Sequence, residues 1–304
     1  MQETDGLDYL GNMAMEDNRT AVEQLIALLD LDAIEVNIFR GVSPKDRSQR
    51  VFGGQVLGQA LVAATRTIDD RFCHSLHAYF LVPGDPKVPI LYEVDRSRDG
   101  KSFSSRRVVA IQHGRQIFHM SVSFQVEEPG LEHQIDPPAV PRPETLPSED
   151  EIRRSVADKV PEAHRENFLR PRPIELRSVD RNSIINPEKR PPHQAVWVKA
   201  TGALPNDRAL HQCVLAYASD MTLLDTSLLP HGMGWFDDRV QMASIDHAMW
   251  FHRPFRADQW LLYVQDSPCA YGARGFNRGL IYSEDGKLVA SVAQEGLMRV
   301  RGVV

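Results

Sequence analysis

Apolar side chains recur at helical spacing in two early segments of the chain. Residues 21–31 place them along one side of a helix, and residues 33–39 are then predicted to be extended. The stretch from Gln55 to Ile68 is apolar around most of the circumference of a helix. Because a helix of that kind has no polar face to present to water, we expect it to lie in a core.

Four segments with the composition of β-strands follow this helix. They are rich in Val, Ile, Phe and Tyr, and Pro-Gly-Asp-Pro, Arg-Asp-Gly and His-Gly-Arg turns separate them. The predicted strands span residues 75–81, 88–96, 102–113 and 116–127. Together these elements predict one long helix laid on an antiparallel sheet.

Prolines then crowd into a short polar stretch that neither a helix nor a strand accommodates. We therefore expect an extended surface linker near 129–147, a polar helix at 148–168 and a strand at 174–179. These boundaries divide the chain into a flexible leader at 1–20, an N-terminal domain at 21–128, a linker with a helix at 129–172, and a C-terminal domain at 173–304.

The second half of the chain repeats the first. His77-Ala-Tyr-Phe matches His247-Ala-Met-Trp-Phe at an offset of 170, and residues 108–124 run parallel to 280–296 at an offset of 172. Two nearly equal offsets indicate one duplicated unit. We expect an α+β fold in which each unit is a helix wrapped by an antiparallel sheet, with the two sheets joined edge to edge.

An acidic residue lies at the flank of the apolar stripe in a helix predicted at 209–228. The stripe runs from Leu210 to Leu228, and Asp220 lies about 80° from its centre at 100° per residue. A carboxylate in that place costs desolvation free energy unless it is paired. Asp220 is therefore either a solvated edge residue or a functional group.

Two further polar residues occupy strand positions of the repeat. Gln294 lies in the last predicted strand, and its counterpart at an offset of 172 is the apolar Val122. Ser244 corresponds to His74 at an offset of 170. A satisfied core amide and a small packing serine are the alternatives to a function. Because the first half lacks both residues, we expect one active site per chain.

These residues lie in longer motifs that resemble a known family. Ala216-Tyr-Ala-Ser-Asp, Ser244-Ile-Asp-His-Ala-Met-Trp-Phe-His-Arg-Pro and Val292-Ala-Gln-Glu-Gly-Leu-Met-Arg look like signature segments of acyl-CoA thioesterase II, the TesB-like double-hotdog thioesterases. Arg50-Val-Phe-Gly-Gly-Gln-Val-Leu-Gly-Gln-Ala and Tyr79-Phe-Leu-Val-Pro-Gly-Asp match the first half of that family. The resemblance extends from about Leu25 to Arg299.

The resemblance implies a double hotdog fold and hydrolysis of acyl-CoA thioesters to free fatty acid and CoA. In the family an Asp, a Thr or Ser, and a Gln hold the attacking water, and these roles fall on Asp220, Ser244 and Gln294. A carboxylate can deprotonate such a water directly, without a covalent acyl-enzyme. Gly53 and Gly54 precede the first central helix, where they either admit the substrate to backbone N–H groups or allow tight packing.

Coenzyme A carries phosphates, which call for basic side chains near the rim of the sheet. Our substrate-binding candidates are Arg106, Arg107 and Arg274, from a wider basic set that adds Arg98, Lys101 and Arg278. Such clusters are also common on solvated faces.

Charge and cysteine content limit the other partners. The net charge of −6, from 35 basic and 41 acidic side chains, argues against nucleic acid and anionic membranes. Cys73, Cys213 and Cys269 are odd in number and far apart, so we expect no disulfide framework and no metal.

The ends of the chain bear on its location. No signal-peptide pattern or long apolar run occurs, and the final Arg301-Gly-Val-Val is not a peroxisomal address. We expect a cytoplasmic protein without cofactors that forms a homo-oligomer, a dimer or a tetramer, through exposed faces of its sheet and helices.

Two other functions are also compatible with the sequence. A hydratase or dehydratase acting on acyl-CoA would need a His beside a carboxylate, and the pairs Asp246–His247 and His74–His77 keep this alternative open. A non-catalytic acyl-CoA-binding module would bind the substrate without turnover.

Overall fold

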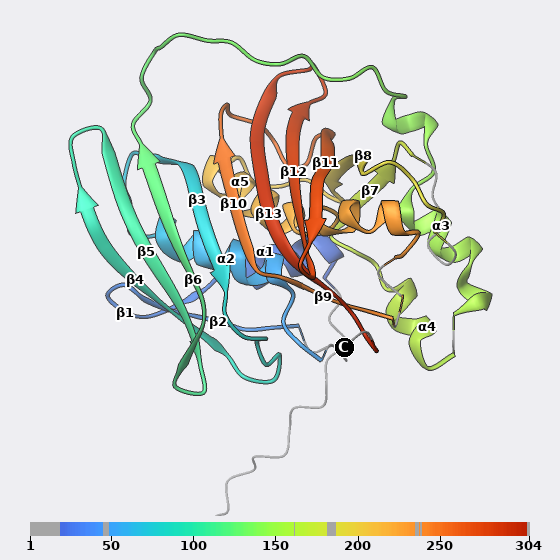
Figure 1. The fold of residues 1–304 in the computed structure, drawn as a ribbon. Helices are drawn as coiled ribbons and strands as arrows, with labels where there is room; N and C mark the ends of the chain where they lie inside the picture. Colours follow the sequence, from blue (N-terminus) through green and yellow to red (C-terminus); the bar gives the residue numbers. More distant parts are fainter. Residues whose placement is uncertain are drawn as a thin grey trace, which may run out of the picture.

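One large antiparallel sheet covers two central helices that lie against the same face (Figure 1). The structure is a computed structural model and describes residues 19–44, 49–160, 162–180, 187–234, 237 and 239–302. The leader expected at 1–20 lies outside the described residues except for its last two positions.

The described residues of the first half form two helices and six strands. In chain order they are α1 (Ala21–Leu29), β1 (Asp32–Glu35), β2 (Ile38–Gly41), α2 (Gly53–Thr65), β3 (Phe72–Phe80), β4 (Ile90–Asp99), β5 (Phe103–Gln112) and β6 (Arg115–Gln125). The helix α1 begins with a capping box between Thr20 and Glu23, which satisfies backbone N–H groups of its first turn.

The second half follows a connection of short helices. The connection holds η1 (Pro143–Thr145), α3 (Glu149–Ser155), η2 (Ala157–Lys159) and α4 (Glu162–Leu169). The second half then holds β7 (Ile174–Ser178), β8 (His193–Ala200), α5 (Arg208–Ser219), η3 (Leu224–Ser227), η4 (Leu229–His231), β9 (Val240–Ser244), β10 (Asp246–Phe251), β11 (Leu261–Tyr271), β12 (Arg274–Ser283) and β13 (Leu288–Val300).

The strands of both halves belong to one sheet. Their order is β1-β2-β4-β5-β6-β3-β10-β13-β12-β11-β8-β7, and β9 pairs with β13. Strands β3 and β10 join the halves, with Tyr79 opposite Asp246 and Ser75 opposite Trp250. Each half is a helix against an antiparallel sheet, so the structure confirms the predicted double hotdog with one continuous sheet.

The segment between the halves takes no helix or strand from residue 126 to residue 142. It crosses the upper edge of the molecule in Figure 1, between β6 and η1. The Gln134 side chain fastens it to the second half, because it donates to the Gly286 carbonyl oxygen at 2.9 Å and accepts from the Leu288 N–H at 3.0 Å.

The two central helices contact each other through backbone. A Cβ at Gly54 would lie 2.3 Å from the Tyr217 carbonyl oxygen, and a Cβ at Gly58 would lie 3.2 Å from that of Cys213. The two glycines are one turn apart on α2, and the two carbonyl oxygens are one turn apart on α5. The absent side chains therefore allow α2 and α5 to approach closely along the contact.

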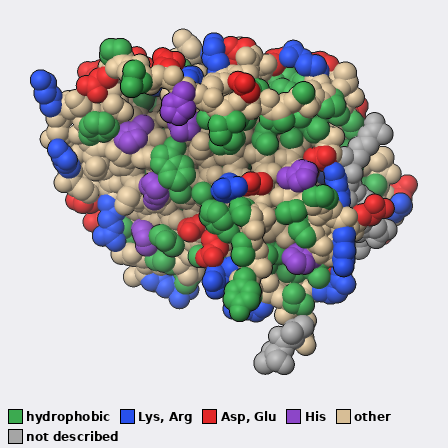
Figure 2. Space-filling model, turned by 45° about the horizontal axis from the view of Figure 1, so that its top comes forward, with side chains coloured by type: hydrophobic (Ala, Val, Ile, Leu, Met, Phe, Trp, Pro, Cys, Tyr) green, Lys and Arg blue, Asp and Glu red, His purple; other side chains and the backbone are tan. Residues whose placement is uncertain are grey.

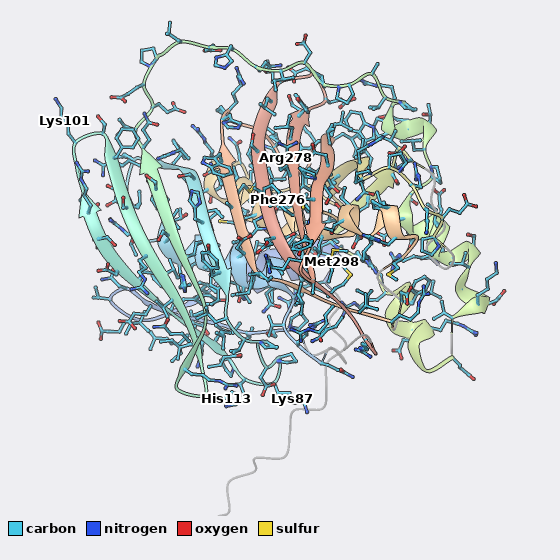
Figure 3. The ribbon with its side chains drawn as sticks, in the orientation of Figure 1. Lys87, Lys101, His113, Phe276, Arg278 and Met298 are labelled. Atoms are coloured by element: carbon cyan, nitrogen blue, oxygen red, sulfur yellow. The ribbon has the colours of Figure 1, made fainter. Side chains whose placement is uncertain are left out.

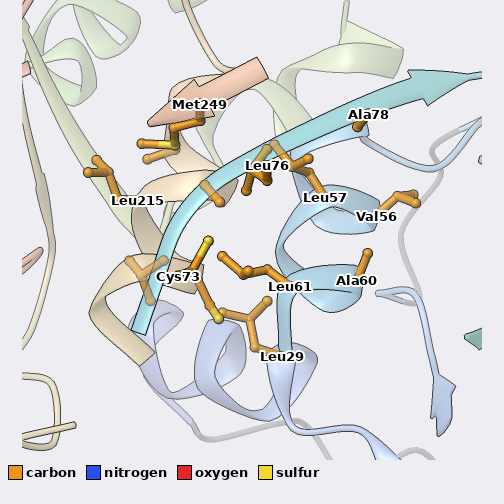
Figure 4. Packing of buried hydrophobic residues seen from close by; sticks show 14 of the residues in the cluster. Leu29, Val56, Leu57, Ala60, Leu61, Cys73, Leu76, Ala78, Leu215 and Met249 are labelled. Carbon is orange, nitrogen blue, oxygen red and sulfur yellow. The ribbon is translucent and has the colours of Figure 1, made fainter. Parts of the chain in front are cut away.

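Apolar side chains fill the space between these helices and the sheet (Figure 4). Leu57 and Leu61 of α2 belong to the same buried cluster as Leu76 of β3, Leu215 of α5 and Met249 of β10. Burying a side chain of this size contributes about 1.5–3 kcal/mol. Because the cluster draws on both halves, they share one core.

The helix predicted at 209–228 is wrong beyond Ser219. Helix α5 ends there with Asp220 as its C-cap, and the chain continues through a turn into η3 and η4. Hydrogen bonds to the sheet favour this ending, since Gln265 of β11 donates to Thr222 Oγ1 at 2.6 Å. Such bonds hold the segment after Asp220 away from the axis of the helix.

Other boundaries differ from the predictions for local reasons. The helix predicted at 148–168 is divided into α3 and α4, and the extended segment at 33–39 is a hairpin of β1 and β2. Asn37 in that hairpin has a φ of +62°, a conformation that asparagine tolerates better than most residues. The helix predicted at 55–68 begins at Gly53 and ends at Thr65.

The structure also corrects the register of the repeat. Cys73 pairs with Phe124 and Ser244 pairs with Gly296, while Phe124 and Gly296 are counterparts at the offset of 172. The counterpart of Ser244 is therefore Cys73, at an offset of 171, and not His74. In each half a β-bulge adds one residue to the chain next to this pair. In the first half the bulge lies between Cys73 and Ser75.

The same correction changes the counterpart of His247. Leu76 pairs with Val122, the counterpart of Gln294, and at an offset of 171 His247 corresponds to Leu76 and not to His77. Burial agrees with this assignment, because His247 and Leu76 are fully buried whereas His77 is exposed. A polar residue of the second half thus stands at an apolar core position of the first.

We expect Gly54→Ala to destabilise the protein by about 1–3 kcal/mol, because the added methyl group would collide with the backbone of α5. Unfolding in urea measures the loss. Gly130→Ala is the matched control, since a Cβ there meets nothing within 4 Å. Equal midpoints for the two variants would contradict the close contact of α2 and α5.

Candidate active site

Three polar residues from separate elements meet at the end of α5. Asp220 is the C-cap of that helix, Ser244 is the last residue of β9, and Gln294 lies within β13. The pairing of β9 with β13 sets Ser244 opposite Gly296, two residues from Gln294. Residues at positions i and i+2 of a strand share one face, so both side chains reach Asp220 from the sheet.

Hydrogen bonds join the three side chains. Ser244 Oγ donates to Asp220 Oδ1 at 3.0 Å, and Gln294 Nε2 donates to the same oxygen at 2.6 Å. Gln294 Nε2 also donates to Ser244 Oγ at 3.0 Å. The structure therefore brings together the residues that the sequence analysis selected, and two donors orient the carboxylate.

The other side of the carboxylate faces the N-terminus of α2. A Cβ at Gly53 would lie 2.6 Å from Asp220 Oδ2, and the Gly54 N–H donates to the carboxylate. Phe52, the N-cap of α2, makes no capping hydrogen bond through its side chain. A negative charge at a helix N-terminus is stabilised by unpaired N–H groups and the helix dipole. Asp220 thus acts as an N-cap supplied by the other half of the chain.

Burial sets the protonation behaviour of this carboxylate. The Asp220 side chain is only 4% exposed. Desolvation raises its pKa to about 6, although the hydrogen bonds from Gln294, Ser244 and the Gly54 N–H act in the opposite direction. A carboxyl group with this pKa is ionised at neutral pH and is a stronger base than an exposed aspartate.

Three buried polar side chains form a row across neighbouring strands of the sheet, close to Asp220. Asn277 of β12 lies opposite Gln294 of β13. Because Ala248 of β10 pairs with Ala293 of β13, the preceding residue His247 also lies opposite Gln294. His247, Gln294 and Asn277 are each fully buried. The first half has Leu76, Val122 and Arg106 in the corresponding row.

Each member of this row leaves an acceptor atom unpaired. Among the described residues, no hydrogen-bond partner lies near His247 Nδ1, Gln294 Oε1 or Asn277 Oδ1. A buried polar atom without a partner is costly, so its presence in a folded protein calls for an explanation. The sequence analysis missed Asn277, and it considered His247 only for the alternative hydratase function.

Two titratable groups lie within electrostatic reach of Asp220. Burial raises the pKa of Asp225, on η3, to about 7, and the charges of Glu149 and Asp220 add to this effect. Tyr263 of β11 donates from its hydroxyl to the Ser219 carbonyl oxygen at 3.1 Å, and burial together with Asp220 raises its pKa. The site is therefore acidic as a whole.

The basic residue Arg106 is engaged within the first half. It is buried, and its guanidinium donates to Thr67, Arg98, Ser105 and Asp99. All of its N–H groups have protein partners, which accounts for Arg106 without a substrate. Its cross-strand partner is Val122, so it lies in the half that lacks the polar row.

The other basic candidates lie on the surface. Arg274 pairs with Glu295 at 2.8 Å, three residues from Asn277 on the same strand. Arg107 is exposed on β5, and Lys101 lies at the tip of the hairpin between β4 and β5, away from the second half (Figure 3). Arg278, on the outer face of β12 in the same view, pairs with Asp266 at 2.6 Å. Along β12, Arg278 lies one residue and Arg274 three residues from Asn277, and both side chains are exposed.

Two further properties concern the described part of the chain. It contains no group of three or more His, Cys, Asp or Glu side chains placed to hold a metal ion. Its helices are all too short or too polar to cross a lipid bilayer.

Comparisons with known proteins match both halves of the chain. The family model described as Acyl-CoA thioesterase covers residues 164–297, and one described as Acyl-CoA thioesterase N-terminal domain covers residues 43–125. Acyl-CoA thioesterase 2 of Haemophilus influenzae is 44% identical over 279 residues, which are 91% of this chain and 98% of that protein. The chain belongs to the acyl-CoA thioesterase family.

Solved structures of this family and of its fold agree with the architecture. The acyl-CoA thioesterase II TesB2 from Mycobacterium marinum has a TM-score of 0.75 and 44% identity, over 90% of this chain and 98% of that one. A protein of unknown function with a hot dog fold from Alicyclobacillus acidocaldarius has a TM-score of 0.72 at 19% identity, over 90% of this chain and 97% of that one. The second match supports the fold alone.

The buried carboxylate should make the stability of this acyl-CoA thioesterase family member depend on pH. Because the folded pKa of Asp220 is raised, its stabilising contribution is complete below the unfolded pKa and is lost as pH rises through about 6. The free energy of unfolding of Asp220→Asn, relative to that of the unsubstituted protein, should therefore rise by about 1–2 kcal/mol between pH 5 and pH 8.

Urea unfolding at several pH values measures this gain. Asp285→Asn, at an exposed carboxylate in the hairpin between β12 and β13, is the control and should show no such gain. An Asp220→Asn variant whose stability difference from the unsubstituted protein stays constant from pH 5 to pH 8 would contradict the raised pKa.

Proposed function

We propose that this protein hydrolyses acyl-CoA thioesters to free fatty acid and CoA, using a water that Asp220 activates and that Ser244 and Gln294 position. The observation that carries the proposal is the hydrogen-bonded cluster of these three side chains around a buried carboxylate. Membership in the acyl-CoA thioesterase family supports the substrate class.

The chemistry requires only the groups present in this cluster. A thioester carbonyl is electrophilic, so a water held in line and deprotonated by Asp220 can attack it directly. The proton passes to the Asp220 carboxylate and then to the departing CoA sulfur. No covalent intermediate on Ser244 is needed, and its hydroxyl is already committed as a donor to Asp220.

The N-terminus of α2 is our candidate for stabilising the oxyanion. Its first turn lies against Asp220, and glycine at positions 53 and 54 keeps side chains away from the backbone N–H groups. Negative charge that develops on the thioester oxygen is stabilised by such donors. The same turn would then orient the base and bind the oxyanion.

We infer one active site per chain. In the first half, the counterparts of Ser244 and Gln294 are Cys73 and Val122, and the C-cap of α2 is Arg66 where α5 has Asp220. None of these three side chains is a carboxylate, so the first half lacks the base. The duplicated half therefore serves the site through the N-terminus of α2.

A hydratase acting on acyl-CoA is the second candidate. The two residue pairs that left this function open are poorly placed for it. Asp246 and His247 are adjacent on a strand and point to opposite faces of the sheet, and His77 of the other pair is exposed. One contact favours it, since His247 Nδ1 lies 4.0 Å from Asp220 Oδ1. Hydration would yield a 3-hydroxyacyl product and no free thiol.

Asp220→Asn should reduce turnover by about 10²–10⁴, the range for loss of a general base. Ser244→Ala and Gln294→Ala should lose less, because they loosen the water without removing the base. Combined substitutions should be less than additive, since all three side chains act on one water. Thiol release from acyl-CoA of several chain lengths measures these rates, with KM nearly unchanged.

Asp285→Asn, at an exposed carboxylate away from the cluster, is the control and should keep the unsubstituted rate. Thiol release by correctly folded Asp220→Asn at the unsubstituted rate would refute the base, and a stable acyl group on Ser244 in mass spectrometry would replace direct water attack with nucleophilic catalysis. A 3-hydroxyacyl product without thiol would support the hydratase.

We also propose a cytoplasmic homo-oligomer. Free, separated cysteines suit a reducing compartment. The outer face of the sheet, which Figure 2 shows with hydrophobic and histidine side chains among the charged ones, carries exposed Tyr79, Leu91 and Phe103 on its strands. Exposed apolar side chains on one face of a sheet favour pairing with a second copy of that face.

Light scattering at micromolar concentration should therefore give a dimer or a tetramer, and Tyr79→Glu should shift it toward the monomer. Tyr271→Glu, at a more exposed tyrosine near the end of β11, is the control. A monomeric unsubstituted protein would refute this assembly.

A further inference from the structure

One buried residue beside the candidate base has no role in the function proposed above. His247 is fully buried on β10, and its counterpart in the first half is the core residue Leu76. A histidine at a position that the duplicated half fills with leucine gives up apolar packing and desolvates a polar ring. The contacts of His247 on the helix side of the sheet indicate what a histidine provides at this position.

The hydrogen bonds of Ser219 determine which nitrogen of His247 carries the proton. Ser219 Oγ donates its single hydrogen to the Ala216 carbonyl oxygen at 2.9 Å, the usual bond of a serine near a helix end. The 2.9 Å contact between Ser219 Oγ and His247 Nε2 then requires the imidazole to donate. Nε2 is therefore protonated, and Nδ1 carries a lone pair.

This lone pair faces the carboxylate of Asp220. His247 Nδ1 lies 4.0 Å from Asp220 Oδ1, and no donor reaches it among the described residues. Two acceptors at this distance repel each other weakly while the carboxylate is ionised. Once Asp220 carries a proton, a shift of about 1 Å would form a normal hydrogen bond from the carboxyl group to Nδ1.

We propose that His247 is a positioning residue for the base, whose Nδ1 accepts a hydrogen bond from the Asp220 carboxyl group after that group has taken the proton of the attacking water. The inference rests on the proposed function of Asp220. His247 acts through Asp220 and does not touch the thioester.

The step conserves atoms and charge. An O–H bond of water breaks as its oxygen bonds to the thioester carbon, and the proton moves to Asp220. The proton stays on Asp220, because burial lowers the pKa of His247 to about 3 and a neutral imidazole accepts the hydrogen bond without taking the proton. Asp220 then returns the proton to the CoA sulfur as the carbon–sulfur bond breaks.

The other titratable groups around this pair have separate partners. Tyr263 of β11 reaches Ser219 through its backbone oxygen, and Asp225 of η3 interacts with Asp220 through charge alone. Asp246 points to the opposite face of β10 and accepts from the Glu295 N–H at 2.7 Å. Asp220 is thus the group whose titration His247 would change.

His247→Leu tests the inference with the residue that the first half uses. Removing the acceptor destabilises the protonated form of Asp220, so the acid limb of the pH profile of kcat/KM should move down by about one unit. We expect kcat to fall about tenfold and KM to stay unchanged. His77→Leu, an exposed histidine on the adjacent strand, is the matched control and should leave the profile in place.

His247→Asn separates positioning from packing. Its side-chain oxygen stands near the place of Nδ1 and can accept from Asp220, so the acid limb should return toward its original position although the bond to Ser219 is lost. If Leu and Asn variants move the acid limb equally, or if folded His247→Leu leaves it unchanged, the inference is wrong.

Ser219→Ala provides a test should His247→Leu fail to fold. Without the serine acceptor the imidazole can place its proton on Nδ1 and donate to the ionised carboxylate, which also moves the acid limb down. An unmoved limb in folded Ser219→Ala would refute the inference.

The role of His247 can also be tested without measuring substrate turnover. The pH-dependent stability difference between a protein that retains Asp220 and its Asp220→Asn variant reports the titration of Asp220 directly, and it should be smaller when His247→Leu is present in both. An inactive unsubstituted protein would refute the proposed function, whereas an active one with an unmoved acid limb would refute only the role of His247.

Discussion

The structure depends on one electrostatic contact, between the carboxylate of Asp220 and the N-terminus of α2. The carboxylate comes from the end of the second central helix and replaces the N-cap that Phe52 cannot provide. This contact is possible only because Gly54 and Gly58 let the two helices approach, and because Gly53 leaves room for the carboxylate. The same interaction therefore joins the halves and stabilises a carboxylate that is almost fully buried.

The two halves share one architecture but differ at the positions that surround Asp220. Both halves have the same helix and strands, yet the row His247, Gln294 and Asn277 stands where the first half has Leu76, Val122 and Arg106. At the positions of His247 and Gln294 the first half has apolar core residues, whereas the second half has hydrogen-bonding groups close to Asp220. One half thus provides Asp220, Ser244 and Gln294, and the other provides the helix terminus that contacts the carboxylate.

Much of this was predictable from the sequence. The duplicated pattern predicted two helix-on-sheet units with joined sheets, and the family resemblance implied the double hotdog. Asp220, Ser244 and Gln294 stood out as polar residues in apolar surroundings, and the resemblance added their roles. The ending of α5 was not predictable, because it depends on hydrogen bonds from Gln265 on a distant strand. His247 was hidden by one bulge residue, since an offset of 170 matched it with the exposed His77 and concealed the contrast with Leu76.

A buried base imposes a conflict that the site resolves by distributing donors and acceptors. Burial makes Asp220 a stronger base but destabilises its ionised form, and the donors Gln294, Ser244 and Gly54 reduce that cost at the expense of basicity. More donors would give a stable but weak base, and fewer would leave the carboxyl group protonated at neutral pH. An acceptor such as His247 Nδ1 acts on the other protonation state, because it stabilises the carboxyl group only after proton transfer. A site with donors for the anion and an acceptor for the acid can therefore lower the cost of both states, which a set of donors alone cannot do.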